Sequence, residues 1–129
     1  MRRRGSTMVE AALVTTAFIF LLVGIMDFGR LGFACNSVTY AAHHAARFAA
    51  TNGSASGHPA TAAGIKSDVL SNIVALNSAS LTVNVTWTPN NNPGSQVQVV
   101  VSYSFQPMLI PISSKALTLK NTSSETITQ

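Results

Sequence analysis

An uncharged apolar run near the N-terminus constrains this chain more than any other feature. The run covers residues 11–26 and follows three consecutive arginines at positions 2–4. At ~1.5 Å per residue, a helix over residues 6–26 is about 31 Å long, which matches the ~30 Å hydrocarbon core of a bilayer. The sequence therefore predicts a helix that crosses a membrane once.

The charges on either side of this run predict its orientation. Arginines precede the run, whereas only Asp27 and Arg30 follow it closely. The positive-inside rule then places the N-terminus in the cytoplasm and residues 31–129 outside it, with the helix in the inner (plasma) membrane. Without residues 1–5, the formal net charge falls from +4 to +1. The remaining chain therefore gives no electrostatic reason to expect nucleic-acid binding.

The helical pattern continues past the predicted membrane boundary. Residues 28–51 contain no proline, and apolar or small side chains recur at helical spacing. These are Leu31, Val38, Ala42, Ala45 and Ala49. We therefore expect one helix from near Ser6 to Thr51, with Asn52 and Gly53 as its stop. Its alanine-rich outer half allows another element to approach closely. The single cysteine, Cys35, excludes an internal disulfide and is expected to be a small buried packing residue.

Residues 53–129 predict a small extracytoplasmic domain and an α+β fold. A second helix is expected from Pro59 to about Leu76, because apolar residues recur along one face. Strict alternation over 81–88 and 97–105, separated by a loop rich in proline and asparagine, predicts a β-hairpin. A last strand from Leu117 to about Ile127 would complete a three-stranded antiparallel sheet. The prolines in residues 107–111 exclude a central strand and predict an exposed connection that could bind a partner.

No motif in the sequence predicts an enzyme. The four carboxylates fall in separate segments, so no local pair suggests acid–base catalysis. His43 and His44 point about 100° apart on a helix and cannot bind one metal ion together. No phosphate-binding loop is present. We expect no cofactor, no metal and no small-molecule substrate.

The junction between Gly5 and Ser6 gives the main functional indication. A basic leader ends at Gly5, Glu10 is the fifth residue after the junction, and an apolar helix follows. This arrangement resembles the processing site of type IV prepilins. The stretch Gly-Ile-Met-Asp-Phe-Gly-Arg at residues 24–30 and the alanine-rich helix that follows are similar to the TadE-like family of pilus-assembly pseudopilins.

The predicted elements and the junction after Gly5 divide the chain into a leader (1–5), a helix (6–52) and an outer domain (53–129). The resemblance implies cleavage after Gly5 by a prepilin peptidase and assembly with other pilin-like subunits of a Tad/Flp-type pilus. It also implies that Glu10 faces the amine of Ser6 on a neighbouring subunit. Where the short major pilins of that system have Glu-Tyr, this longer chain has Glu10 and Ala11, which favours a minor pilin or pseudopilin.

Two questions stay open at the level of sequence. An unprocessed single-pass anchor that presents a small extracytoplasmic binding domain would have the same apolar run. Asp27 and Arg30 lie three residues apart on one helix face, where they form either a partner-recognition pair or a salt bridge at the membrane boundary.

A secretory signal peptide is disfavoured, because no Ala-x-Ala-like cleavage site directly follows the run.

Overall fold

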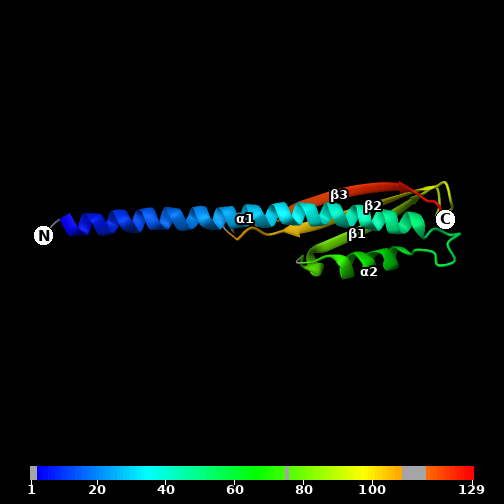
Figure 1. Ribbon diagram of the computed structural model, residues 1–129, viewed down its shortest axis with the longest axis horizontal. Helices are drawn as coiled ribbons and strands as arrows, with labels where there is room; N and C mark the ends of the chain where they lie inside the picture. Colours follow the sequence, from blue (N-terminus) through cyan, green and yellow to red (C-terminus); the bar gives the residue numbers. More distant parts are fainter. Residues whose placement is uncertain (1–2, 75, 109–115) are drawn as a thin grey trace.

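A long helix carries a small head at one end (Figure 1) in the computed structural model, which describes residues 3–74, 76–108 and 116–129. The elements are α1 (Arg3–Thr51), α2 (Ala62–Asn72), a 3-10 turn η1 (Ser78–Ser80), β1 (Leu81–Thr88), β2 (Gln96–Phe105) and β3 (Leu117–Thr126). The predicted α+β layout is confirmed. In the expected connection 107–111, residues 109–111 lie outside the described part of the chain.

α1 is continuous from the leader to the head. It begins at Arg3 and not near Ser6, because arginine favours helices and Gly5 alone does not end one. It ends at Thr51 as predicted, where the amide of Asn52 donates to the carbonyl of Phe48 at 3.1 Å. A Cβ at Gly53 would overlap the C-terminal residues, so the chain can turn closely past them only with glycine there.

α2 is shorter than the expected helix from Pro59 to Leu76. The hydroxyl of Thr61 accepts a hydrogen bond from the amide of Gly64 at 3.1 Å, and this N-cap starts the helix at Ala62. The helix ends at Asn72, and Ile73 is already extended. The apolar spacing therefore predicted the buried face correctly, whereas the capping threonine, and not the proline, sets the first turn.

The three strands form an antiparallel sheet in the order β1-β2-β3. In the centre of the sheet, Val99 of β2 pairs with Val85 of β1 and with Ser123 of β3. The odd-numbered residues of β2 face the core, and Val97, Val99 and Val101 are fully buried. The predicted alternation, the hairpin and the third strand are confirmed, with β3 ending at Thr126.

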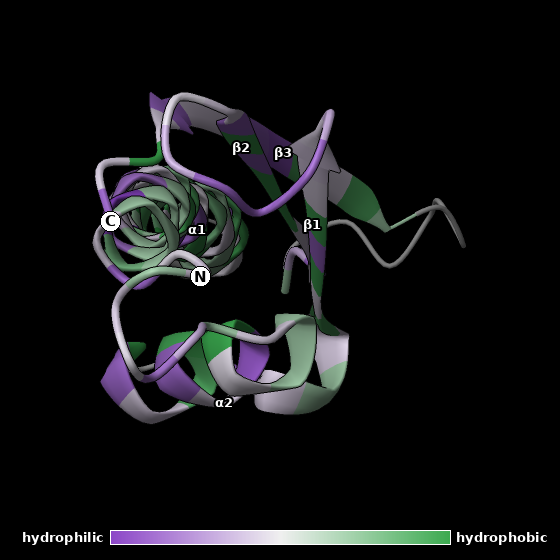
Figure 2. Cartoon of the chain, turned by 90° about the vertical axis from the view of Figure 1, so that its right-hand side faces the viewer, coloured by the Kyte–Doolittle hydropathy of each residue, from purple (hydrophilic) through white to green (hydrophobic). Residues whose placement is uncertain are grey.

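The core lies where the outer half of α1, the sheet and α2 meet. Figure 2 shows α1 end-on, with the sheet along one side and α2 below it. Small residues on the outer half of α1 are nearly or completely buried. These are Ala34, Val38, Ala41, Ala42, Ala45, Ala46, Ala49 and Ala50, which we call the alanine face. Ile65 and Val69 of α2 and Ile127 after β3 complete this core.

Cys35 is exposed, and the prediction of a buried packing residue is wrong. The preceding residue, Ala34, is 1% exposed and lies on the alanine face. A step of one residue turns a helix by about 100°, which directs Cys35 away from the sheet.

Enlarging the alanine face should destabilise the head. Ala45 is completely buried in the core of the head, so Ala45→Leu should lower the free energy of unfolding by about 1–3 kcal/mol through overpacking. Urea unfolding of the full chain in detergent, followed by the fluorescence of Trp87, measures this change. Asn36→Leu on the exposed side of α1 is the control. Equal stability of the two variants would contradict close packing at Ala45.

Candidate processing and assembly surface

The N-terminal half of α1 projects from the head and is strongly apolar (Figure 1). Large side chains along it, such as Leu13, Phe18 and Ile25, are more than half exposed. Among the described residues, α1 is the one helix long and apolar enough to cross a membrane, and its most apolar stretch is not buried by the rest of the chain. These properties are consistent with a membrane anchor.

The residues of the predicted processing site lie on this projecting segment. Gly5 and Ser6 are in the first turns of α1. Apart from the neighbouring residues and the backbone of the helix itself, no described atom lies within 4 Å of the place where a Cβ would stand on Gly5. Glu10 is exposed one turn further on, and within the described chain it makes no hydrogen bond or ion pair. The segment therefore presents these three residues to whatever surrounds the helix.

Asp27 and Arg30 meet at the junction between the projecting segment and the head. Their side chains form a salt bridge of 2.9 Å between a guanidinium nitrogen and Oδ1. The other carboxylate oxygen of Asp27 accepts a hydrogen bond from the backbone amide of Met108 at 2.8 Å. The Arg30 guanidinium lies 5.5 Å from the ring centroid of Phe105. Asp27 thus links α1 to the segment that follows β2.

Asp27 and Arg30 bind each other and other residues of the same chain. The Asp27 side chain is only 12% exposed, whereas that of Arg30 is 47% exposed. An exposed ion pair contributes roughly 0–1 kcal/mol. A hydrogen bond to a charged acceptor contributes about 1.5–3 kcal/mol, so the bond from Met108 matters at least as much for the junction. Contact of either side chain with a partner stays a prediction. Glu10 lies 17 residues before Asp27, about 25 Å along the helix, and belongs to a separate place on the molecule.

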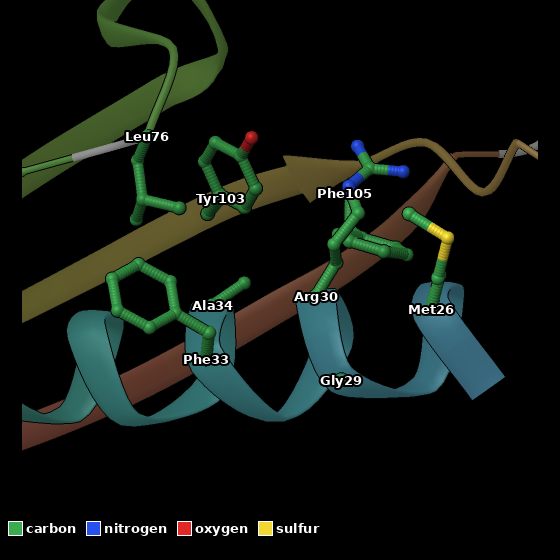
Figure 3. Close-up of a pocket in the computed structure, with 8 residues that line it drawn as sticks. All are labelled: Met26, Gly29, Arg30, Phe33, Ala34, Leu76, Tyr103 and Phe105. Atoms are coloured by element: carbon green, nitrogen blue, oxygen red, sulfur yellow. The ribbon is translucent and has the colours of Figure 1, made fainter.

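Two apolar grooves that are lined by described residues flank Phe105 at this junction. The larger, of about 420 Å³, is the one in Figure 3, where Arg30 extends beside Phe105. It is lined by Met26, Gly29, Arg30, Phe33, Ala34, Leu76, Tyr103 and Phe105. The second, of about 220 Å³, lies between α1, Pro107 and Leu117. We refer to them as the large and the small junction groove.

His43 and His44 contact different elements of the head. Nδ1 of His43 lies 3.0 Å from the hydroxyl of Ser123 on β3. Nδ1 of His44 lies 3.3 Å from a carboxylate oxygen of Asp68 on α2, and its ring stacks on Tyr40. Among the residues that the structure describes, no three His, Cys, Asp or Glu side chains gather in a way that could hold a metal ion. These contacts fasten β3 and α2 to α1.

Sequence reasoning missed the polar contacts between α1 and β3. The amide of Asn121 donates to the hydroxyl of Thr39 at 3.1 Å, beside the contact between His43 and Ser123. The alternation of β3 contained the signal, because Asn121 and Ser123 occupy the odd positions that face the helix. The contact between Asp27 and Met108 left no comparable signal, because it joins a helix to a residue outside regular structure.

Comparison with known proteins identifies the N-terminal part of the chain. Residues 5–47 match the family model described as TadE-like protein. This segment is TadE-like. The match begins at Gly5, includes Glu10, Asp27 and Arg30, and ends on the alanine face, whereas the sheet lies outside it. The TadE-like segment relates the chain to pilin-like proteins of Tad pilus systems. Neither a search of curated proteins nor a search of solved structures found a match.

Removing the Asp27 carboxylate should release the segment after β2 from α1. In Asp27→Ala the Met108 amide loses its charged acceptor, so its hydrogen exchange should accelerate on the order of tenfold. Glu125→Ala removes an exposed carboxylate from β3 and should leave this exchange rate unchanged. Hydrogen–deuterium exchange of the full chain in detergent measures both, and unchanged exchange at Met108 in Asp27→Ala would contradict the link.

Proposed function

We propose that this chain is a minor pilin or pseudopilin that a prepilin peptidase cleaves after Gly5 and that then acts in assembly of a Tad/Flp-type pilus. The observation that carries the proposal is the TadE-like match, which begins at Gly5 and follows the projecting half of α1. In this proposal α1 anchors the protein in the inner membrane, with the arginine leader in the cytoplasm and residues 53–129 outside it.

The position of Gly5 supports cleavage at this bond. A peptidase must reach the scissile carbonyl, and apart from the adjacent residues no described side chain lies within 4 Å of the place where a Cβ would stand on Gly5. Glycine lowers the stability of a helix by about 1 kcal/mol relative to alanine, so α1 opens more easily there than at neighbouring residues. The three arginines of the leader hold this bond at the cytoplasmic edge of the membrane.

Glu10 supports assembly through α1. Cleavage would give Ser6 a cationic amine, and the family resemblance pairs Glu10 with that amine on a neighbouring subunit. Glu10 has no partner within the described part of its own chain, and a carboxylate close to lipid is costly unless it is interfacial or paired. Pairing across subunits would offset this cost for both charges. The exposed apolar half of α1 then supplies the surface on which the helices of other subunits pack.

Blocking cleavage tests the processing step. When the chain is expressed with a prepilin peptidase, Gly5→Val should keep residues 1–5, because the branched side chain obstructs the approach to the bond. The wild type should begin at Ser6. Gly32→Val, at another helical glycine with open space around it, is the control and should be cleaved. Intact mass of the membrane-extracted protein measures all three. A wild type that begins at Met1 would favour the unprocessed anchor.

Removing the Glu10 carboxylate tests the assembly step. Glu10→Ala should still be cleaved and inserted, but it should lose most photo-crosslinking to other subunits from a photoreactive residue placed at Val14. Glu125→Ala, which removes a carboxylate from the head, should crosslink like the wild type. Undiminished crosslinking and normal pili in Glu10→Ala would mean that Glu10 is only a solvated carboxylate at the start of the helix.

A further inference from the structure

We propose that the membrane-proximal end of the head docks on the phospholipid surface of the outer leaflet, with Met108 inserted among the lipids. This end consists of Phe28 on α1, Met108 after β2, and Leu117 at the start of β3, and we call it the membrane rim. The inference rests on the proposed membrane span of α1. It adds a second contact between the chain and the bilayer, made by the head.

The hydrogen bond between Met108 and Asp27 determines the depth of the membrane rim relative to the bilayer. Asp27 directly follows the apolar run, so it marks the end of the segment that fits the hydrocarbon core. The headgroup layer adds roughly 5–7 Å on each side of that core, which α1 crosses in about four residues. Because its amide binds the Asp27 carboxylate at 2.8 Å, Met108 lies at the depth of the headgroups.

The side chains of the rim are apolar and exposed at that depth. Phe28 is 77% exposed, Met108 70% and Leu117 48%. They come from three separate segments of the chain, and nothing in the described head covers them. An apolar surface that adjoins a membrane span is covered by lipid without any further partner, because the bilayer is already in contact with the adjacent turn of the helix.

The polar groups of the rim suit a headgroup layer. A backbone amide that enters lipid needs an acceptor, and Asp27 supplies one to Met108. Arg30 holds its guanidinium over the ring of Phe105 while about half of its side chain remains exposed. Its free guanidinium N–H groups can donate to a lipid phosphate at the same level. The two junction grooves open beside Phe105 and provide apolar space for the upper part of an acyl chain.

Depth-dependent quenching of a single fluorophore tests this docking. In a Cys35→Ser background, one cysteine replaces Met108, Phe18 or Gln96, and each variant carries an environment-sensitive label. All three positions are exposed, so the substitutions leave the core intact. The full chain is reconstituted at low density into phosphatidylcholine and phosphatidylglycerol vesicles. These vesicles contain lipids with a spin-label quencher either at the headgroup or near the end of the acyl chain.

We expect the label at 108 to lose more fluorescence with the headgroup quencher than with the deep quencher. The label at 18 should show the reverse, and the label at 96, at the far end of β2, should lose none. Quenching at 18 without quenching at 108 would overturn the docking and leave the proposed function standing. No quenching at 18 would overturn the membrane span itself. Quenching at 108 that disappears at high protein density would show that another subunit, and not lipid, covers the rim.

Discussion

Close packing between the alanine face of α1 and the valines of β2 is the constraint on which the rest of the structure depends. Alanine side chains let the helix axis approach the sheet, and they are nearly or completely buried together with Val97, Val99 and Val101. Because α1 is one continuous helix, this contact fixes the direction in which the projecting segment leaves the head. It also fixes which residue stands at the boundary between the two, and that residue is Asp27.

The two halves of α1 therefore have different surroundings. Its outer half contributes small residues to a protein core, whereas its N-terminal half carries large apolar side chains that the head leaves uncovered. The change of residue size along α1 follows from this division, because close helix–sheet packing needs small side chains and a lipid environment does not. The TadE-like match covers both halves and stops before the sheet, so the helix carries the relationship to pilin-like proteins.

Sequence periodicity predicted the elements that bury one apolar face. The end of α1 at Thr51, the hairpin and the third strand follow from spacing and from turn residues. The first turn of α2 does not follow from spacing, because both Pro59 and Thr61 are residues that can start a helix. The hydrogen bond from the amide of Gly64 to the hydroxyl of Thr61 determines that α2 starts after Thr61. The prediction that Cys35 is buried was wrong, because it relied on the residue type. The position of a residue on the helix indicates its burial more reliably than its type does. The contact between Asp27 and Met108 spans 81 positions and depends on the docked head, so no local pattern could reveal it.

Accessibility of the native cysteine tests the central claim, which is that α1 leaves the membrane near Asp27 and continues outside the cytoplasm. Cys35 is exposed and lies about 13 Å beyond Met26 along the helix, past the headgroup layer. A membrane-impermeant maleimide should modify Cys35 in intact spheroplasts, whereas a cysteine at Phe18 in a Cys35→Ser chain should stay unmodified. Modification of Cys35 only after the membrane is permeabilised would contradict this orientation, and modification at residue 18 in intact spheroplasts would contradict the span.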